Sequence, residues 1–127
     1  MAHSPGHRQH PEHKVVESPV EGRMTVELGG VVLADSRDVV RVEEDGNPAR
    51  YYFPRDDVQM QLLKPSAKTT TCPFKGNANY FSIRTEGEKV DDAVWSYEDP
   101  YDEHAGLKGR VAFDEATSAA LLIRSLP

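Results

Sequence analysis

Apolar and polar side chains alternate with a period of two across residues 24–53, and this pattern constrains the fold more than any other feature of the sequence. Met24, Val26 and Leu28 alternate with polar neighbours, as expected for a strand that buries one face. A Gly-Gly pair at residues 29–30 then permits the positive φ angles of a two-residue turn, and turn-forming residues recur between the next apolar runs. Because short turns join antiparallel strands, this part of the chain predicts an antiparallel meander of four strands.

The rest of the sequence also favours strands, because no segment keeps a helical period. Residues 54–57 and 99–107 suit short helices, and residues 116–123 fit a helix or a strand equally well. We expect a mainly β fold of antiparallel β-sheets with at most one or two short helices. At 127 residues, 38% of them hydrophobic, the chain suits one domain, which we place at residues 19–127.

Residues 1–18 are expected to form a flexible N-terminal tail. They contain proline and glycine, lack a periodic apolar pattern and hold four of the five histidines, namely His3, His7, His10 and His13. Spaced imidazoles are common metal ligands, yet a site without a fold to fix its geometry would be weak. We therefore expect a polar leader and no metal site in this segment.

Charge is distributed unevenly along the chain. The net charge of −6 argues against broad nucleic-acid binding. Residues 50–84 nevertheless carry six basic and two acidic side chains, whereas residues 86–115 carry ten acidic and three basic ones. A basic middle beside an acidic end can create a local anion site, or the two stretches can be solvated faces that neutralise each other. Only the first interpretation implies a ligand.

Several features that define other classes of protein are missing. No apolar run approaches the roughly 20 residues of a membrane-spanning helix, and the N-terminus lacks the apolar stretch of a signal peptide. We therefore expect a cytoplasmic protein without a membrane partner. The single cysteine excludes an intramolecular disulfide framework and a zinc site of several thiolates. Phosphate-loop and dinucleotide-binding motifs are also missing, so no particular cofactor is indicated.

The segment 69–76 has the highest density of reactive side chains. It combines three threonines with Cys72, Lys75 and Gly76. Nearby cations would make an exposed Cys72 thiol more nucleophilic, and Lys75 could bind a phosphate or a carboxylate as a point charge. Gly76 would let the backbone approach the same anion. The alternative is that Cys72 is a small buried apolar group and that Lys75 is a turn residue.

Aromatic residues form a second set of candidates. Trp95 and Tyr97 alternate along one predicted strand and so share a face, as do Tyr51 and Phe53. One such face is expected to belong to the core, while the other rings could line a pocket in which a lysine or arginine fixes an anionic ligand. Asp35 is a candidate general base, although its position also suits a solvent-facing strand end.

Four stretches occur in the order typical of one family: Val32-Leu33-Ala34-Asp35-Ser36, Tyr51-Tyr52-Phe53-Pro54-Arg55, Thr71-Cys72-Pro73-Phe74-Lys75-Gly76 and Ala93-Val94-Trp95-Ser96-Tyr97-Glu98-Asp99-Pro100. Together they resemble the bacterial and fungal domain of unknown function 427 family over residues 13–113. The resemblance implies a fold similar to the β-tent domains, in which antiparallel β-sheets lean together. Relatives with that architecture often bind zinc through two cysteine pairs, so the single cysteine implies a zinc-free version.

Three functions are compatible with these features. The first is a small-molecule-binding β domain, catalytic or not, whose anionic ligand contacts residues that mix charge with aromatic rings: Asp35, Arg55, Cys72, Lys75, Gly76, Trp95 and Tyr97. The second is a nucleotidyltransferase-like enzyme. It matches a label that the family carries, although the Gly-Ser and spaced aspartates of common nucleotidyltransferases are missing here. The third is a non-catalytic protein-interaction module that uses sheet edges or the acidic C-terminal portion.

Overall fold

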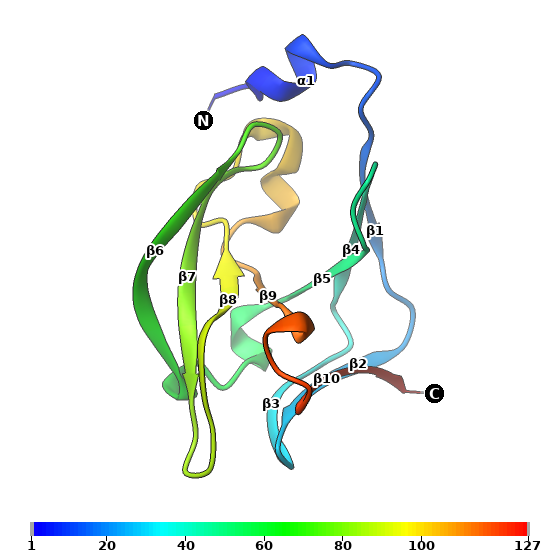
Figure 1. Ribbon diagram of the computed structural model, residues 1–127. Coiled ribbons are helices and arrows are strands. Elements are labelled where there is room, and N and C mark those ends of the chain that lie inside the picture. Colours follow the sequence, from blue (N-terminus) through cyan, green and yellow to red (C-terminus); the bar gives the residue numbers. More distant parts are fainter. Residues whose placement is uncertain (1, 127) are drawn as a thin grey trace.

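The computed structural model describes residues 2–126, so Met1 and Pro127, which end the predicted tail and the predicted domain, lie outside the described residues. Within residues 2–126 the chain forms two antiparallel sheets (Figure 1), and the prediction of a mainly β fold is confirmed. The larger sheet has the strand order β1-β4-β5-β9-β8-β7-β6, and the smaller one has the order β10-β2-β3.

The strands and helices of residues 2–126 have the following bounds. The strands are β1 (Val15–Pro19), β2 (Arg23–Leu28), β3 (Val31–Ser36), β4 (Val40–Glu44), β5 (Arg50–Phe53), β6 (Leu63–Cys72), β7 (Gly76–Arg84), β8 (Lys89–Ser96), β9 (Val111–Phe113) and β10 (Leu121–Leu126). The helical elements are the α-helix α1 (Pro5–Gln9) and the 3-10 helices η1 (Arg55–Asp57), η2 (Met60–Leu62), η3 (Asp102–Leu107) and η4 (Glu115–Thr117). The predicted short helices at 54–57 and 99–107 thus appear as η1 and η3, and the ambiguous segment 116–123 becomes η4 and the start of β10.

The hairpin between β2 and β3 forms as the alternation predicts. Gly29 and Gly30 have φ angles of 54° and 85°, a region that favours glycine. The predicted four-stranded meander is wrong in its pairing, however, because β4 pairs with β1 and β5 and not with β3. Residues 15–19 take the place beside β4, and β3 stays in the smaller sheet.

Alternate side chains of the central strands enter two different hydrophobic clusters. Phe53 in β5 and Val94 in β8 belong to the cluster that also contains buried residues of the smaller sheet. Tyr52 and Trp95, their neighbours in sequence, lie in a second cluster. Because successive side chains of a strand point to opposite faces, this second cluster lies on the face of the larger sheet that is turned away from the smaller sheet.

Residues 2–19 contact the rest of the protein through hydrogen bonds and strand pairing. β1 pairs with β4 over its whole length, and Gly6 of α1 donates its amide hydrogen to the Pro73 carbonyl at 2.8 Å. The buried Ser4 caps α1 and donates its hydroxyl hydrogen to the same carbonyl at 2.7 Å. These contacts are hydrogen bonds to the backbone, so they leave no pattern of apolar residues in the sequence.

Among residues 2–126, every helix is too short or too polar to span a lipid bilayer.

Candidate functional site

A pocket of about 370 Å³ lies on the face of the larger sheet that is turned away from the smaller sheet, beside the second hydrophobic cluster. Its aromatic lining consists of Tyr52 from β5, Tyr80 from β7, Trp95 from β8 and Tyr97 immediately after β8. Tyr80 is directly opposite Trp95 in the register of β7 and β8, so the two rings are neighbours on one face. The volume is in the range of small-molecule sites.

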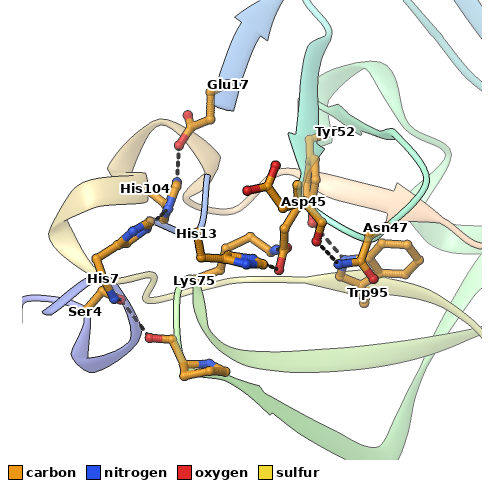
Figure 2. A network of polar contacts seen from close by, with 12 residues as sticks. Ser4, His7, His13, Glu17, Asp45, Asn47, Tyr52, Lys75, Trp95 and His104 are labelled. Atoms are coloured by element: carbon orange, nitrogen blue, oxygen red, sulfur yellow. Dashed lines mark hydrogen bonds and ion pairs between the residues drawn. The ribbon is translucent and has the colours of Figure 1, made fainter. Parts of the chain in front are cut away.

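Contacts among these rings hold the lining in place. Trp95 donates its Nε1 hydrogen to the Tyr52 hydroxyl at 3.1 Å (Figure 2), and the two rings meet edge to face with their centroids 6.3 Å apart. Trp95 is only 8% exposed although it lines the pocket. Burial raises the pKa of the Tyr52 and Tyr97 hydroxyls, so both remain neutral at physiological pH. The aromatic part of the lining is therefore uncharged, and its rings hold one another in place.

Two cations lie over adjacent rings of this lining. The guanidinium carbon of Arg50 is 5.2 Å from the centre of the Trp95 ring, and the ammonium nitrogen of Lys68 is 4.6 Å from the centre of the Tyr80 ring. The centres of the two aromatic rings are 6.5 Å apart. Cation–π attraction positions such side chains without neutralising their charge, so both cations can still bind an anion.

The acidic side chains of the pocket already have partners within the protein. Four acids line it, namely Glu44, Asp91, Asp92 and Asp114. Their partners are, in the same order, Lys75, Arg84, Ser66 and Arg50. The Arg50–Asp114 pair is loose at 3.6 Å, and Lys68 takes part in no salt bridge among residues 2–126. Among the same residues, no group of three or more histidine, cysteine, aspartate or glutamate side chains could hold a metal ion.

Lys75 lies at the wall of this pocket, and its charge is committed to Glu44. Lys75 is 7% exposed, and its Nζ donates to Glu44 Oε1 at 2.5 Å. The other carboxylate oxygen of Glu44 is 3.0 Å from His13 Nε2, which places His13 beside Lys75 (Figure 2). Burial alone would raise the pKa of Glu44, but the hydrogen bonds from Lys75 and His13 outweigh it and lower that pKa.

Three of the seven predicted site residues meet at the pocket: Lys75, Trp95 and Tyr97. Asp35 lies elsewhere, on β3 of the smaller sheet, where its two carboxylate oxygens each accept a hydrogen bond from Arg23 at 2.7 Å. The hydrogen bond from Arg23 holds the pKa of the Asp35 carboxyl below its usual value. A general base at neutral pH needs the opposite shift, so this environment does not favour the role that the sequence suggested for Asp35.

Arg55 connects segments that lie outside the pocket lining. Its Nε donates to the Gly109 carbonyl at 2.7 Å, and its Nη2 donates to the Ser96 hydroxyl at 3.1 Å and to Glu98 at 2.9 Å. The guanidinium carbon also lies 5.6 Å from the centre of the Phe81 ring. These contacts connect η1 to the end of β8 and to the loop before β9, so Arg55 links segments of the protein to one another.

Cys72 and Gly76 flank the turn between β6 and β7 and do not line the pocket either. Cys72 is partly buried and packs against the second cluster. Gly76 has a φ of 127°, and a Cβ there would lie 3.4 Å from the Asp99 carbonyl oxygen and from Pro100 Cα. The positive φ angle therefore favours glycine here, while a Cβ would meet its neighbours only at van der Waals distance.

The sequence analysis did not single out Arg50 or Lys68. Arg50 lies two residues before Tyr52 in the same strand, and a period of two puts both on one face, so this signal was present in the sequence. Lys68 had no comparable signal. The register between β6 and β7 shifts between Pro65 and Thr69, and such an irregularity hides the face to which a side chain points.

Comparison with protein families supplies the classification. A family model described as a domain of unknown function (DUF427) matches residues 17–122, which include every residue that lines the pocket. Among curated proteins, none matches this sequence. Since the matched range covers most of the chain and agrees with the resemblance found in the sequence, this protein belongs to the DUF427 family.

Proposed function

We propose that the pocket binds a small organic anion, and that Arg50 and Lys68 hold the charged group of this ligand above Trp95 and Tyr80. The observation that carries the proposal is the placement of two cations over adjacent aromatic rings in one pocket. Aromatic faces contribute contact area and hold the cations, while the cations supply the attraction for the anion. A carboxylate or a phosphate ester meets both requirements.

Four acidic and three basic side chains line the pocket, so support for this ligand class comes from which of these charges already have partners in the protein. Glu44, Asp91 and Asp92 have close partners, and Asp114 accepts a hydrogen bond from the Ala116 amide at 3.1 Å. Lys68 forms no salt bridge among residues 2–126, and Arg50 has only a distant one with Asp114. Arginine binds carboxylates and phosphates through two parallel hydrogen bonds, and lysine adds a point charge. In this proposal Lys75 supports the pocket wall through Glu44, and Tyr97 completes the apolar lining.

A variant of Lys68 tests the proposal. Lys68→Met keeps most of the length of the side chain but removes its charge, and we expect affinity for benzoate and for inorganic phosphate to fall about tenfold because one charged contact is lost. Trp95 is the single tryptophan of the chain, so the change in its fluorescence reports occupancy of the pocket directly. Raising the ionic strength should weaken binding to wild type, since screening acts on partly exposed charges.

The matched control is Lys64→Met, which alters an exposed lysine of the same strand that does not line the pocket. This variant changes the net charge equally and should bind both probes like wild type. Thermal melts of the two variants establish that each remains folded. Equal affinities in Lys68→Met and Lys64→Met, or no fluorescence response of wild type to either probe, would refute the proposal.

A further inference from the structure

Residues 2–14, which we call the N-terminal strap, are held at the end of the larger sheet chiefly by hydrogen bonds. Two of these bonds go from Ser4 and Gly6 to the carbonyl of Pro73, and the amide of Ser4 donates to the Glu103 carboxylate at 2.9 Å and 3.1 Å. The strap also covers the ring of Phe74, which lies between two histidines of the strap. Its attachment therefore depends on polar groups, some of which can gain a proton.

The strap is joined to the body through a pair of histidines. His7 Nε2 lies 2.9 Å from His104 Nε2, and His104 Nδ1 lies 2.5 Å from Glu17 Oε2 of β1 (Figure 2). His104 is only 3% exposed. The ring of His7 packs edge-on against Phe74 with 5.0 Å between the ring centres, and the ring of His13 stacks on the same phenyl at 4.4 Å.

The number of protons on this pair determines whether the contact can exist. Because Glu17 accepts the Nδ1 hydrogen of His104, a neutral His104 offers the lone pair of Nε2, and His7 donates its Nε2 hydrogen to it. One additional proton is tolerated, since a charged His104 then donates to the Nε2 lone pair of His7. A second additional proton puts a hydrogen on both facing nitrogens and adds repulsion between two cations, which is incompatible with 2.9 Å.

We propose that the N-terminal strap is a pH-sensitive cover: when both His7 and His104 are protonated, their contact breaks, the strap leaves the body and the ring of Phe74 becomes accessible. The proposal rests on the histidine pair and does not depend on the ligand of the pocket. It predicts a strap that is attached at neutral pH and released in mild acid.

Other charged groups around His7 modulate this transition. They are Glu103 of η3, Glu44 of β4, and His13 within the strap, in addition to His104 and its partner Glu17. Glu103 and Glu44 favour a charged His7 and so oppose release, whereas His13 disfavours a charged His7. Burial and the neighbouring His104 prevail, and the pKa of His7 lies below its usual 6.5.

Because the pKa of His7 is lowered in the attached state, acid weakens the attachment of the strap. A histidine whose pKa is lowered in the attached state stabilises attachment above the pKa of the free strap, and this contribution is lost as the pH falls below about 6.5. Each further pH unit below that value should weaken attachment about tenfold, until the attached state itself takes up the proton.

Amide hydrogen exchange measured by NMR tests the proposal on the full chain. The Gly6 amide, which is bonded to Pro73, should progressively lose protection as the pH falls below about 6.5, after correction for intrinsic exchange. The Gly109 amide, which donates to the Tyr97 carbonyl, reports the stability of the remaining fold and should stay protected. The ¹⁵N signals of His7 should titrate with the same midpoint as the Gly6 protection.

Two glutamine variants make the experiment specific. His7→Gln retains a donor and an acceptor but does not titrate, so the Gly6 amide should lose its pH dependence. His10→Gln changes an exposed histidine of the same segment, 60% exposed in its side chain, and should behave like wild type. If His7→Gln leaves Gly6 unprotected at every pH, agreement between the His7 and Gly6 midpoints in wild type supports the proposal and disagreement overturns it. Constant Gly6 protection in wild type, or unchanged pH dependence in His7→Gln, also overturns it.

Discussion

Replacing Trp95 with alanine is expected to lower the free energy of unfolding by about 3–5 kcal/mol. The ring is 8% exposed and packs against Tyr52 and Tyr80, so truncation leaves a cavity in the second hydrophobic cluster. It also removes the hydrogen bond to the Tyr52 hydroxyl and the ring beneath Arg50. Urea unfolding followed by circular dichroism measures the change, because the variant retains no tryptophan for fluorescence.

Trp95→Phe separates the contribution of packing from that of the hydrogen bond. Phenylalanine keeps most of the buried aromatic area but has no donor for Tyr52, so we expect a loss of about 1–2 kcal/mol. A loss below about 1 kcal/mol in Trp95→Ala would mean that the ring contributes to the pocket wall without supporting the fold.

The parts of the fold that depend on local sequence could be predicted. The hairpin of β2 and β3 follows from side-chain alternation and from Gly29-Gly30, both of which act over a few residues. The position of β1 could not be predicted in this way. Residues 15–19 pair with residues 40–44, and their side chains show no regular alternation of burial. Pairing between distant segments leaves little trace in either segment alone.

The candidate site could also be predicted only where local sequence determines it. Trp95 and Tyr97 were placed on one face by the strand period, and both line the pocket with Lys75. Arg55 and Asp35 belong to the predicted site because they are charged members of the four family stretches, but Arg55 bonds to Gly109 and Asp35 bonds to Arg23. Charge and residue type alone do not distinguish a side chain that meets a ligand from one that connects two segments of the protein.

Breaking the ion pair between Lys75 and Glu44 is expected to cause the second large loss of stability. Glu44→Ala is expected to cost about 3 kcal/mol, because the Lys75 ammonium, with 9% of its side chain exposed, is left without its carboxylate partner. His13 loses its acceptor in the same variant. Denaturant melts near neutral pH measure this loss. Glu44→Leu combined with Lys75→Met removes both charges and keeps apolar volume, so the double variant should lie within about 1 kcal/mol of wild type.

Lowering the pH should reduce the contribution of the Lys75–Glu44 pair to the stability of wild type. Burial alone would raise the pKa of Glu44, but the hydrogen bonds from Lys75 and His13 lower it below its usual 4.5. A lowered pKa means that the contribution of Glu44 is present above the pKa of the unfolded chain and is lost as the pH falls through the lower pKa of the folded state. The stability of wild type relative to the double variant should therefore be constant near neutral pH and decrease below about pH 4.5. A difference that stays constant down to about pH 3, or a Glu44→Ala variant as stable as wild type, would show that Lys75 does not need Glu44 and can meet a ligand anion directly.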